Sequence, residues 1–517
     1  MSPTRREAVR AAGAGLTTFA LGPALRRRAT RLTILHTTDL HAQLDPHDEL
    51  FWENDQPVFK RRGGLATLRA MITAIRQENA GPVLLVDGGD TWHGSGVASL
   101  SRGAAITPFI DKLGYDLVLP GNWEVVYGKE TMVAELGRLT ATAICANMWH
   151  DGPGRRSLFP PFHLFQLGDL RVGFVGYNDP DTPTRQSPAY SRGIRFTKPE
   201  ESLAGHVRTL RQSRGCDLVF VLSHLGLTQQ LDLANHPSAR GVDYILGGDT
   251  HERVREPLRG RFAQVTEPGA FGSFLGRLDL TMESGRLREV RYQLLDVDPA
   301  QWGEDAEMTA LVAAAKAPYR AELERVIGRT TTPLYRYFII ETPLDNLITD
   351  ALMWRFGTDF VVSQGFRFCP PLVPGPSGVA EITRDFLWSM LPVDAVVKMG
   401  QVRGSQILDW LERELENVFA TEAGRRVESV LIGGRPVERG KVYSMVACER
   451  EGDPNDVLCR FRGVQRPRRL DAQLHEVMIG YLAAHSPVAP VVEGRAVAVD
   501  QPATLLSQAY GTGYRFR

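Results

Sequence analysis

The sequence predicts an α/β fold built in layers, followed by a second and smaller α/β domain. Short apolar stretches alternate with segments of helical spacing over residues 31–298, and the alternation restarts near Thr330. Polar clusters also follow the apolar stretches of the first part, at the strand ends where α/β folds bind ligands.

Each element of the first part follows from its apolar pattern. Apolar residues at helical spacing predict a helix over residues 64–79, and a second helix is expected over 199–214. Uninterrupted apolar runs bounded by polar or glycine residues predict six buried strands: 32–36, 83–86, 117–119, 172–176, 218–222 and 244–246.

The second part is separated by a change in composition. Residues 299–329 are rich in Ala, Glu and Arg and predict a connecting helix, which Pro318 divides into two shorter ones. We therefore expect a first domain over 31–298, this linker, and a second domain over 330–517. In the second domain the predicted helices are 344–356 and 405–419, and the predicted strands are 360–362 and 393–397.

The overall composition excludes several classes of protein. The 517 residues carry 60 basic and 60 acidic side chains, so the formal net charge is zero. That balance argues against a protein that coats nucleic acid or acidic membranes. Five cysteines without a C-x-x-C pair exclude a disulfide scaffold and a zinc ribbon.

The N-terminus has the features of an export signal. Arg5 and Arg6 precede a mildly apolar stretch over residues 11–25 that is too short for a comfortable membrane span. Residues 1–30 are therefore expected to be a twin-arginine signal that sends the folded chain to the periplasm, with no membrane segment in the mature form. The alternative is a basic tail, which Arg10 and the run 26–28 favour.

Five polar clusters at predicted strand ends carry the chemistry. Carboxylate, imidazole and amide oxygen together suit Mn²⁺, Fe²⁺ or Zn²⁺. Two such ions in one site would activate a water molecule and stabilise an oxyanion. Taken singly, each cluster could be a turn, a helix cap or a core histidine, but five of them in one α/β unit favour a metal site. They are Asp39-Leu40-His41, Gly88-Gly89-Asp90, Gly121-Asn122-Trp123-Glu124, Ser223-His224 and Gly248-Asp249-Thr250-His251.

The order of these clusters resembles that of the calcineurin-like metallophosphoesterases, and more closely that of the exported 5′-nucleotidases. The resemblance implies an α/β/β/α sandwich with two divalent ions, followed by a 5′-nucleotidase-type substrate domain. It further implies that Asp90 bridges the two ions. Asp39, His41 and His251 would hold the first ion, and Asn122, His224 and Asp249 the second.

Two motifs depart from the family pattern. Trp123 stands where the family has a histidine that supports the leaving group, and Asp249 stands where it has a metal-binding histidine. A carboxylate at the second position favours manganese, although zinc and iron share these ligands. The alternative is that Asp249 is only a turn residue. Tryptophan has no acid–base function, and its presence resembles the SoxB branch, the thiosulfohydrolases of periplasmic sulfur oxidation.

The second domain resembles the same branch. Residues 363–368 read Ser-Gln-Gly-Phe-Arg-Phe where the nucleotidases carry a glycine-rich arginine loop. Arg367 is expected to hold the oxygens of a sulfonate or phosphate, although alone it could equally be a surface ion pair. The loop 451–456 fits the nucleotidase pattern only loosely, which counts mildly against a nucleotide substrate.

The resemblance implies a hydrolase that releases sulfate from a cysteine S-thiosulfonate on a SoxYZ-like carrier protein. Trp123 would shape a narrow channel for the carrier, and Glu124 would orient the metal ligands. Two other interpretations stay open. One is a 5′-nucleotidase or related phosphoesterase, and the other is a non-catalytic metal- or ligand-binding protein on a decayed hydrolase scaffold.

Overall fold

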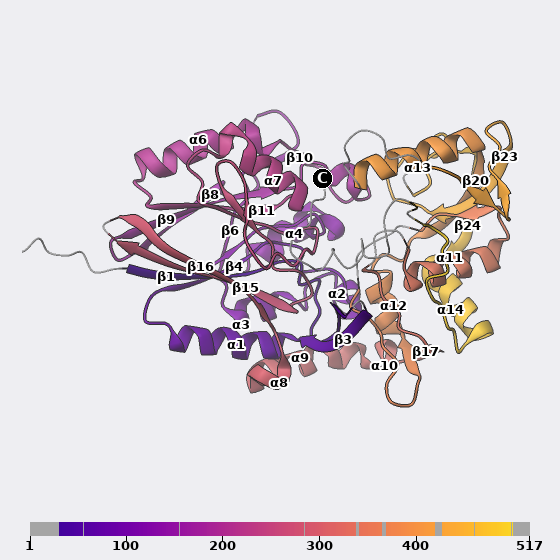
Figure 1. The fold of residues 1–517 in the computed structure, drawn as a ribbon, viewed down its shortest axis with the longest axis horizontal. Helices are drawn as coiled ribbons and strands as arrows, with labels where there is room; N and C mark the ends of the chain where they lie inside the picture. The colour runs from indigo at the N-terminus through magenta and orange to yellow at the C-terminus, as the bar shows by residue number, and fades with distance from the viewer. Residues whose placement is uncertain are drawn as a thin grey trace, which may run out of the picture.

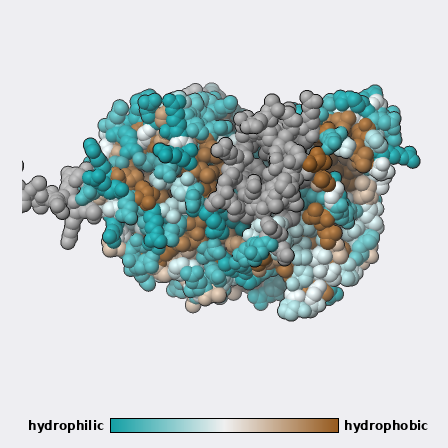
Figure 2. Space-filling view, in the orientation of Figure 1, coloured by the Kyte–Doolittle hydropathy of each residue, from teal (hydrophilic) through white to brown (hydrophobic). Residues whose placement is uncertain are grey.

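A computed structural model describes residues 30–54, 56–154, 156–283, 285–337, 341–363, 369–418, 427–459, 461–497 and 499. The expected signal over residues 1–30 lies outside these residues except for Thr30, and so do Arg367 and most of its loop. Within the described part of the chain, no helix is long and apolar enough to cross a bilayer. On the face shown in Figure 2, hydrophilic side chains cover most of the first domain, with small hydrophobic patches between them.

Two six-stranded sheets form the centre of the first domain (Figure 1). The first has the order β16 (Arg286–Asp296), β15 (Phe274–Glu283), β1 (Thr30–Thr37), β4 (Val83–Asp87), β5 (Leu117–Val118) and β6 (Thr142–Ala143). The second has the order β13 (Leu258–Arg259), β14 (Gln264–Thr266), β12 (Tyr244–Leu246), β11 (Leu218–His224), β9 (Leu170–Asn178) and β8 (Phe162–Leu167). The six predicted strands are β1, β4, β5, β9, β11 and β12.

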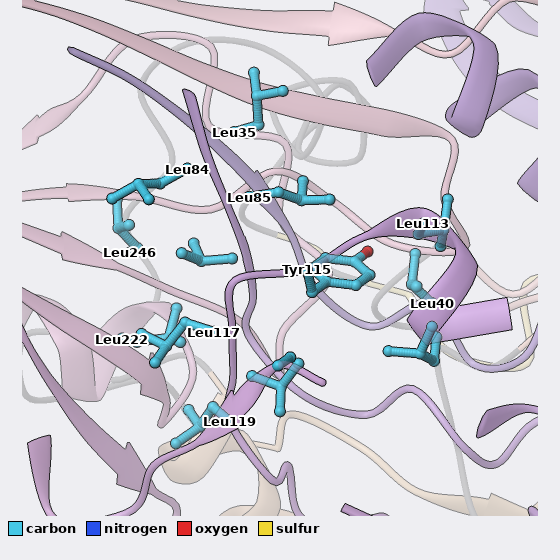
Figure 3. Packing of buried hydrophobic residues seen from close by; sticks show 14 of the residues in the cluster. Leu35, Leu40, Leu84, Leu85, Leu113, Tyr115, Leu117, Leu119, Leu222 and Leu246 are labelled. Carbon is cyan, nitrogen blue, oxygen red and sulfur yellow. The ribbon is translucent and has the colours of Figure 1, made fainter. Parts of the chain in front are cut away.

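The alternating direction of side chains along each strand explains why the two sheets pack face to face. In β11, Leu218, Phe220 and Leu222 belong to the core shared with the first sheet, whereas Val219 and Val221 belong to the core under the outer helices. Successive side chains of a strand point to opposite faces, so a strand that is apolar throughout is covered on both. Figure 3 shows leucines of the two sheets in the shared core, among them Leu222 and Leu246 of the second sheet.

Helices cover the outer faces and complete an α/β/β/α sandwich (Figure 1). The helices α1 (Leu65–Glu78), α3 (Thr107–Leu113) and α9 (Ala306–Lys316) cover the first sheet, and α6 (Leu203–Arg208) and α7 (Leu227–Asn235) cover the second. The helix expected over 199–214 is not continuous. A 3₁₀ turn at Pro199–Glu201 precedes α6, and a π-helical turn at Thr209–Ser213 follows it.

The connecting segment is helical only in its first part. It contains α9, a 3₁₀ turn at Ala317–Tyr319 that includes Pro318, and α10 (Arg320–Leu323). The sequence prediction was wrong from Val326 onward, because β17 (Val326–Thr330) is a strand paired with β19 (Ala380–Thr383). Its β-branched residues fit a pleated, half-buried surface better than a helix.

The second domain is a smaller α/β unit (Figure 1, orange and yellow). Its sheet has the order β18 (Phe360–Val361), β23 (Val442–Cys448), β20 (Val396–Arg403) and β24 (Gln465–Gln473). The strand expected at 393–397 begins only at Val396, because the amide of Ala395 closes a turn onto Val393. The helices are α11 (Pro343–Phe356), α12 (Arg384–Met390), α13 (Gly404–Val418) and α14 (Leu474–His485).

Further described elements occur along the chain between the strands and helices of the sandwich. They are the hairpin β2 (Pro46–Glu53) and β3 (Gln56–Gly63), α2 (Gly96–Ser101), a 3₁₀ turn at Glu124–Tyr127, α4 (Lys129–Leu136), β7 (Met148–His150), α5 (Thr182–Arg185), β10 (Ile194–Phe196), a 3₁₀ turn at Pro237–Ala239 and α8 (Pro299–Trp302). Two short strands of the second domain, β21 (Leu431–Ile432) and β22 (Arg435–Pro436), pair with each other.

Candidate metal centre

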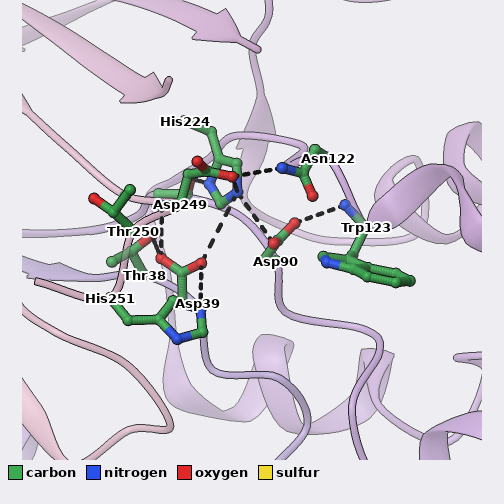
Figure 4. A network of polar contacts seen from close by, with 12 residues as sticks. Thr38, Asp39, Asp90, Asn122, Trp123, His224, Asp249, Thr250 and His251 are labelled. Carbon is green, nitrogen blue, oxygen red and sulfur yellow. Dashed lines mark hydrogen bonds and ion pairs between the residues drawn. The ribbon is translucent and has the colours of Figure 1, made fainter. Parts of the chain in front are cut away.

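Five strands deliver polar side chains to one place, because their carboxyl ends lie on the same edge of the two sheets. Figure 4 shows the result, with Asp39 between His251 and His224 and with Trp123 beyond Asp90. The sources are β1 for Asp39 and His41, β4 for Asp90, β5 for Asn122, β11 for His224, and β12 for Asp249 and His251.

The backbone of the site is strained. Asp39, His41, Asp90, Asp249 and His251 all have φ between +46° and +88°. Side chains with a Cβ enter this left-handed region at a cost of about 1 kcal/mol or more each. Strain concentrated on five polar residues of one cluster is typical of a functional site, where the surrounding fold holds groups in positions that the chain would not adopt alone.

The first group of candidate ligands is Asp39, His41 and His251. The Nε2 atoms of the two imidazoles are 3.0 Å apart, and His251 Nε2 lies 3.3 Å from Asp39 Oδ1. The ring of Phe271 packs on both imidazoles, with centroids 6.0 and 5.2 Å away. Three donor atoms of the right chemistry thus converge against an apolar wall.

The second group is Asp39, Asp90 and His224. His224 Nε2 lies 3.2 Å from Asp90 Oδ2 and 3.9 Å from Asp39 Oδ1. Asp90 Oδ2 is also 3.9 Å from His41 Nε2, so its carboxylate reaches both groups. The structure places Asp39 as well as Asp90 between the two sets of histidines.

These residues fit a metal centre on two further observations. The Nδ1 atoms of His41 and His224 donate to the carbonyls of His93 and Gly88, at 2.9 and 2.7 Å, which turns the Nε2 atoms toward the cluster. Asp39 Oδ1 and His224 Nε2 are buried and have no hydrogen-bond partner among the described residues. Buried polar atoms are rarely left this way, and divalent cations would satisfy them.

Asn122 and Asp249 lie beside this cluster and contact each other. The Asn122 amide nitrogen donates to Asp249 Oδ1, which is 3.8 Å from His224 Nε2. The Asn122 oxygen accepts a 2.9 Å bond from Gln186, and Asp249 Oδ2 accepts a 2.9 Å bond from Arg185. Each predicted second-site ligand therefore has a partner that holds one end of its side chain.

The carboxylate of Glu124 binds backbone N–H groups of two loops. Its Oε1 accepts from the amides of Thr91 and Trp92, and its Oε2 accepts from those of Asp90 and Gly121, at distances between 2.5 and 3.2 Å. Burial and the charge of Asp90 raise the pKa of Glu124 to about 7, against the four N–H bonds that favour the carboxylate. The side chain ties the Asp90 loop to the Asn122 loop.

Glycine makes this close approach of the two loops feasible. A Cβ on Gly89, whose φ is +100°, would lie 2.5 Å from the backbone nitrogen of Gly121. Only glycine accommodates both the left-handed backbone and the contact. The Gly-Gly-Asp motif is thus explained by the packing of one strand end against the next.

Trp123 is buried beside Asp90, and its backbone N–H donates a 2.7 Å bond to Asp90 Oδ1. Its side chain stacks on His93, with ring centroids 4.9 Å apart. His93 Nδ1 in turn is 2.9 Å from the hydroxyl of Tyr127. Trp123 therefore contributes an apolar surface beside Asp90, one of the candidate metal ligands.

Sequence reasoning missed several residues around the site, including Asp179, Arg185 and Gln186. Asp179 follows Asn178 at the end of β9, so the rule that polar residues at strand ends form the site would have found it. Arg185 ends the short helix α5 and Gln186 follows it, and no sequence pattern marks either residue. Arg367, the remaining predicted catalytic residue, lies outside the described residues.

Metal binding is expected to release a proton from His224. Burial disfavours its charged form, but Asp90, Asp39 and Asp249 outweigh burial and raise its pKa well above the usual 6.5. The metal-free site therefore holds a proton at neutral pH that a cation must displace, so metal affinity should fall as pH is lowered. Calorimetric Mn²⁺ titrations in buffers of different ionisation enthalpy measure the number of protons released when the metal binds. Release of no proton on metal binding at pH 7 would contradict the assignment of His224 as a metal ligand that is protonated in the metal-free site.

Two family models match the chain. The calcineurin-like phosphoesterase model covers residues 32–253, and the 5′-nucleotidase C-terminal domain model covers 326–448. Protein UshA of Escherichia coli K12 is 24% identical over 92% of this chain and 95% of that protein. A 5′-nucleotidase of Vibrio cholerae is 24% identical over 89% of this chain and 91% of its own length.

Solved structures have the same fold. The sulfate thiohydrolase SoxB of Thermus thermophilus superposes with a TM-score of 0.78, at 23% identity, over 91% of this chain and 97% of that one. A 5′-nucleotidase precursor from the same species also gives 0.78, at 24% identity, over 91% of this chain and all of that one. The expected sandwich and the smaller C-terminal α/β domain are confirmed.

Proposed function

We propose that the chain is a member of the calcineurin-like phosphoesterase superfamily in the two-domain form of the 5′-nucleotidases, whose fold binds divalent metals, because one family model matches residues 32–253 and the other matches 326–448. From this premise we propose that it is a binuclear-metal hydrolase that releases sulfate from a cysteine S-thiosulfonate on a carrier protein. The observation that carries the proposal is Trp123, whose backbone N–H bonds Asp90 and which follows Asn122 where the motif that this chain resembles has a histidine.

The chemistry of the leaving group connects Trp123 to this substrate. An alkoxide that leaves a phosphate ester is strongly basic and benefits from a proton donor. A sulfur leaving group is far less basic, since a thiol has a pKa near 8.5 and bulk water one of about 15.7. A site without an acid at this place suits cleavage of a bond to sulfur.

The proposed reaction balances with water alone. The oxygen of water bonds to the sulfone sulfur as the bond from that sulfur to the neighbouring sulfane sulfur breaks. The sulfane sulfur keeps the electron pair and a proton, which leaves a persulfide on the carrier cysteine. Sulfate and one further proton are released. Two bound divalent ions would supply an activated water and positive charge for the sulfonate oxygens.

The chain's own residues would orient and shield this reaction. Asp39, Asp90, His41, His224 and His251 offer the donor atoms that would hold the ions. Glu124 fixes the loop of Asp90, and Trp123 with His93 gives an apolar wall that excludes water from one side.

Further parts of the proposal rest on the sequence. We propose manganese as the metal, because Asp249 adds a third carboxylate to the site. Arg367 would hold the sulfonate oxygens from the second domain, and a SoxYZ-like carrier would bring the substrate. The twin-arginine motif in residues 1–30 would direct the chain to the periplasm.

The decisive test offers the manganese-loaded chain a carrier protein charged as the S-thiosulfonate, with AMP hydrolysis measured beside it. Sulfate release without appreciable phosphate release supports the proposal. Phosphate release alone would make the chain a 5′-nucleotidase. Less than one tightly bound ion per chain would favour a decayed scaffold that binds ligand without catalysis.

Trp123→His should shift the ratio of the two activities. We expect AMP hydrolysis to rise roughly tenfold or more relative to sulfate release, since a positioned general acid contributes about 10²–10⁴-fold in favourable cases. Trp149→His, which removes a tryptophan from β7 outside the metal cluster, is the matched control. An unchanged ratio in Trp123→His would remove the argument from the leaving group.

A further inference from the structure

One contact between the two domains lies directly behind the metal centre. Arg450, at the end of β23 in the second domain, is buried, and its Nη1 donates to the carbonyls of Thr184 and Arg185 at 2.7 and 3.3 Å. The same guanidinium makes a two-pronged ion pair with Asp453, at 2.7 and 3.0 Å. The remaining donors of Arg450 are thus fixed while it holds two carbonyls of the first domain.

The backbones of the two loops also touch. The amide of Ala189 donates a 3.2 Å bond to the carbonyl of Glu451. At Gly452, whose φ is +89°, a Cβ would lie 2.9 Å from the nitrogen of Ala189. Residues 450–453, which we call the latch, are therefore shaped to fit against residues 179–189, which we call the bridge segment.

The bridge segment reaches the metal centre through two side chains. Arg185 Nη1 contacts Asp249 Oδ2 at 2.9 Å and Asp179 Oδ2 at 2.6 Å, and both carboxylates are nearly inaccessible to solvent. Gln186 is buried and donates a 2.9 Å bond to Asn122 Oδ1. Asn122 and Asp249, two of the three residues predicted for the second ion, are thus oriented from this one segment.

The charge of Arg185 matters because the centre is rich in carboxylates. Asp39, Asp90 and Asp249 bring three negative charges close together, and Asp179 adds a fourth behind them. A cation held against Asp249 and Asp179 offsets that repulsion and leaves Asp249 Oδ1 directed toward His224. A buried ion pair of this kind depends on its geometry, which the carbonyl contacts of Arg450 help to fix.

We propose that Arg450 is a positioning residue for the second metal ion. The latch holds the bridge segment where Arg185 and Gln186 orient Asp249 and Asn122, so binding of the second ion is coupled to docking of the second domain. The proposal concerns the metal centre alone and holds for a thiosulfonate or a phosphate ester. By thermodynamic reciprocity, binding of the second ion also strengthens the contact between latch and bridge.

Arg450→Met tests the coupling by Mn²⁺ titration of the metal-free full chain. Second-sphere changes typically weaken metal binding about 10–100-fold. We expect the second ion to bind roughly tenfold more weakly and the affinity for the first ion to be unchanged. In the wild type, loading with Mn²⁺ should slow hydrogen exchange at the amide of Ala189, and in Arg450→Met it should not.

Two further variants separate coupling from general stability. Arg384→Met breaks another ion pair of the second domain, with Glu322 of α10, and should leave both affinities unchanged. Gly452→Ala wedges the latch away from Ala189 without changing charge, and should reproduce the selective loss even if Arg450→Met folds poorly. Wild-type second-ion affinity in both Arg450→Met and Gly452→Ala would overturn the proposal. So would an equal loss for both ions, or a selective loss in Arg384→Met.

Discussion

Asp39→Asn is expected to abolish tight binding of both metal ions and to lower hydrolysis by roughly 10³-fold or more. Asp39 belongs to both candidate ligand groups, and its Oδ1 lies 3.3–3.9 Å from the Nε2 atoms of His251, His41 and His224. The amide keeps the shape of the side chain but removes the negative charge that two cations would share. Asp39 Oδ2 accepts hydrogen bonds from the Thr38 hydroxyl and from the backbone N–H of Asp249. The asparagine side chain of the variant preserves these loop contacts only if its oxygen, and not its NH₂ group, takes the place of Oδ2.

Metal content separates this effect from misfolding. Elemental analysis of the purified protein should give about two ions per chain for the wild type and less than one for Asp39→Asn. Asp45→Asn is the matched control, because that carboxylate is half exposed and pairs with Lys316 instead of facing the centre. Two tightly bound ions in Asp39→Asn would show that the ions bind elsewhere.

Glu124→Gln is expected to destabilise the first domain by roughly 3 kcal/mol and to disorder the loop of Asp90. Each carboxylate oxygen accepts two backbone N–H groups, so a glutamine amide fits in neither orientation. Its NH₂ group would face two donors whichever way it turns. Relief of the repulsion between Glu124 and Asp90 offsets only part of this loss.

Thermal unfolding and metal titration together check this prediction. The unfolding midpoint of Glu124→Gln should fall, and metal affinity should weaken about 10–100-fold because Asp90 loses its support. Glu130→Gln on α4 is a suitable control, since that side chain is largely exposed and pairs with Lys129 at the surface. A Glu124→Gln protein with the stability of the wild type would mean that the loops are held by other contacts.

The regular parts of the fold were predictable because they follow from local pattern. The inner strand β11 is apolar from Leu218 to Leu222, as a strand covered on both faces must be, and α1 has the spacing of a one-sided helix. Patterns failed where backbone geometry changes within one segment. The π-helical turn at Thr209–Ser213 and the strand Val326–Thr330 are examples, since each continues a stretch of helix-like composition.

The residues of the candidate metal centre could be predicted from the sequence because each follows a strand that ends on the same edge of the sheets. This rule applies strand by strand and requires no knowledge of how distant segments meet. It therefore brought out Asp39, Asp90 and His224 in advance. Their distances, and the left-handed backbone of the loops, come only from the packed structure.

The sequence by itself determined the fold class, the order of the strand ends and the chemical types of the candidate ligands, because these depend on periodicity and residue identity. The tertiary structure alone decided that Glu124 joins two loops, that Arg185 faces Asp249, and that Arg450 of the other domain holds the segment between them. These are contacts between residues up to hundreds of positions apart, and no local pattern in a chain encodes which distant backbone carbonyl a buried arginine will meet.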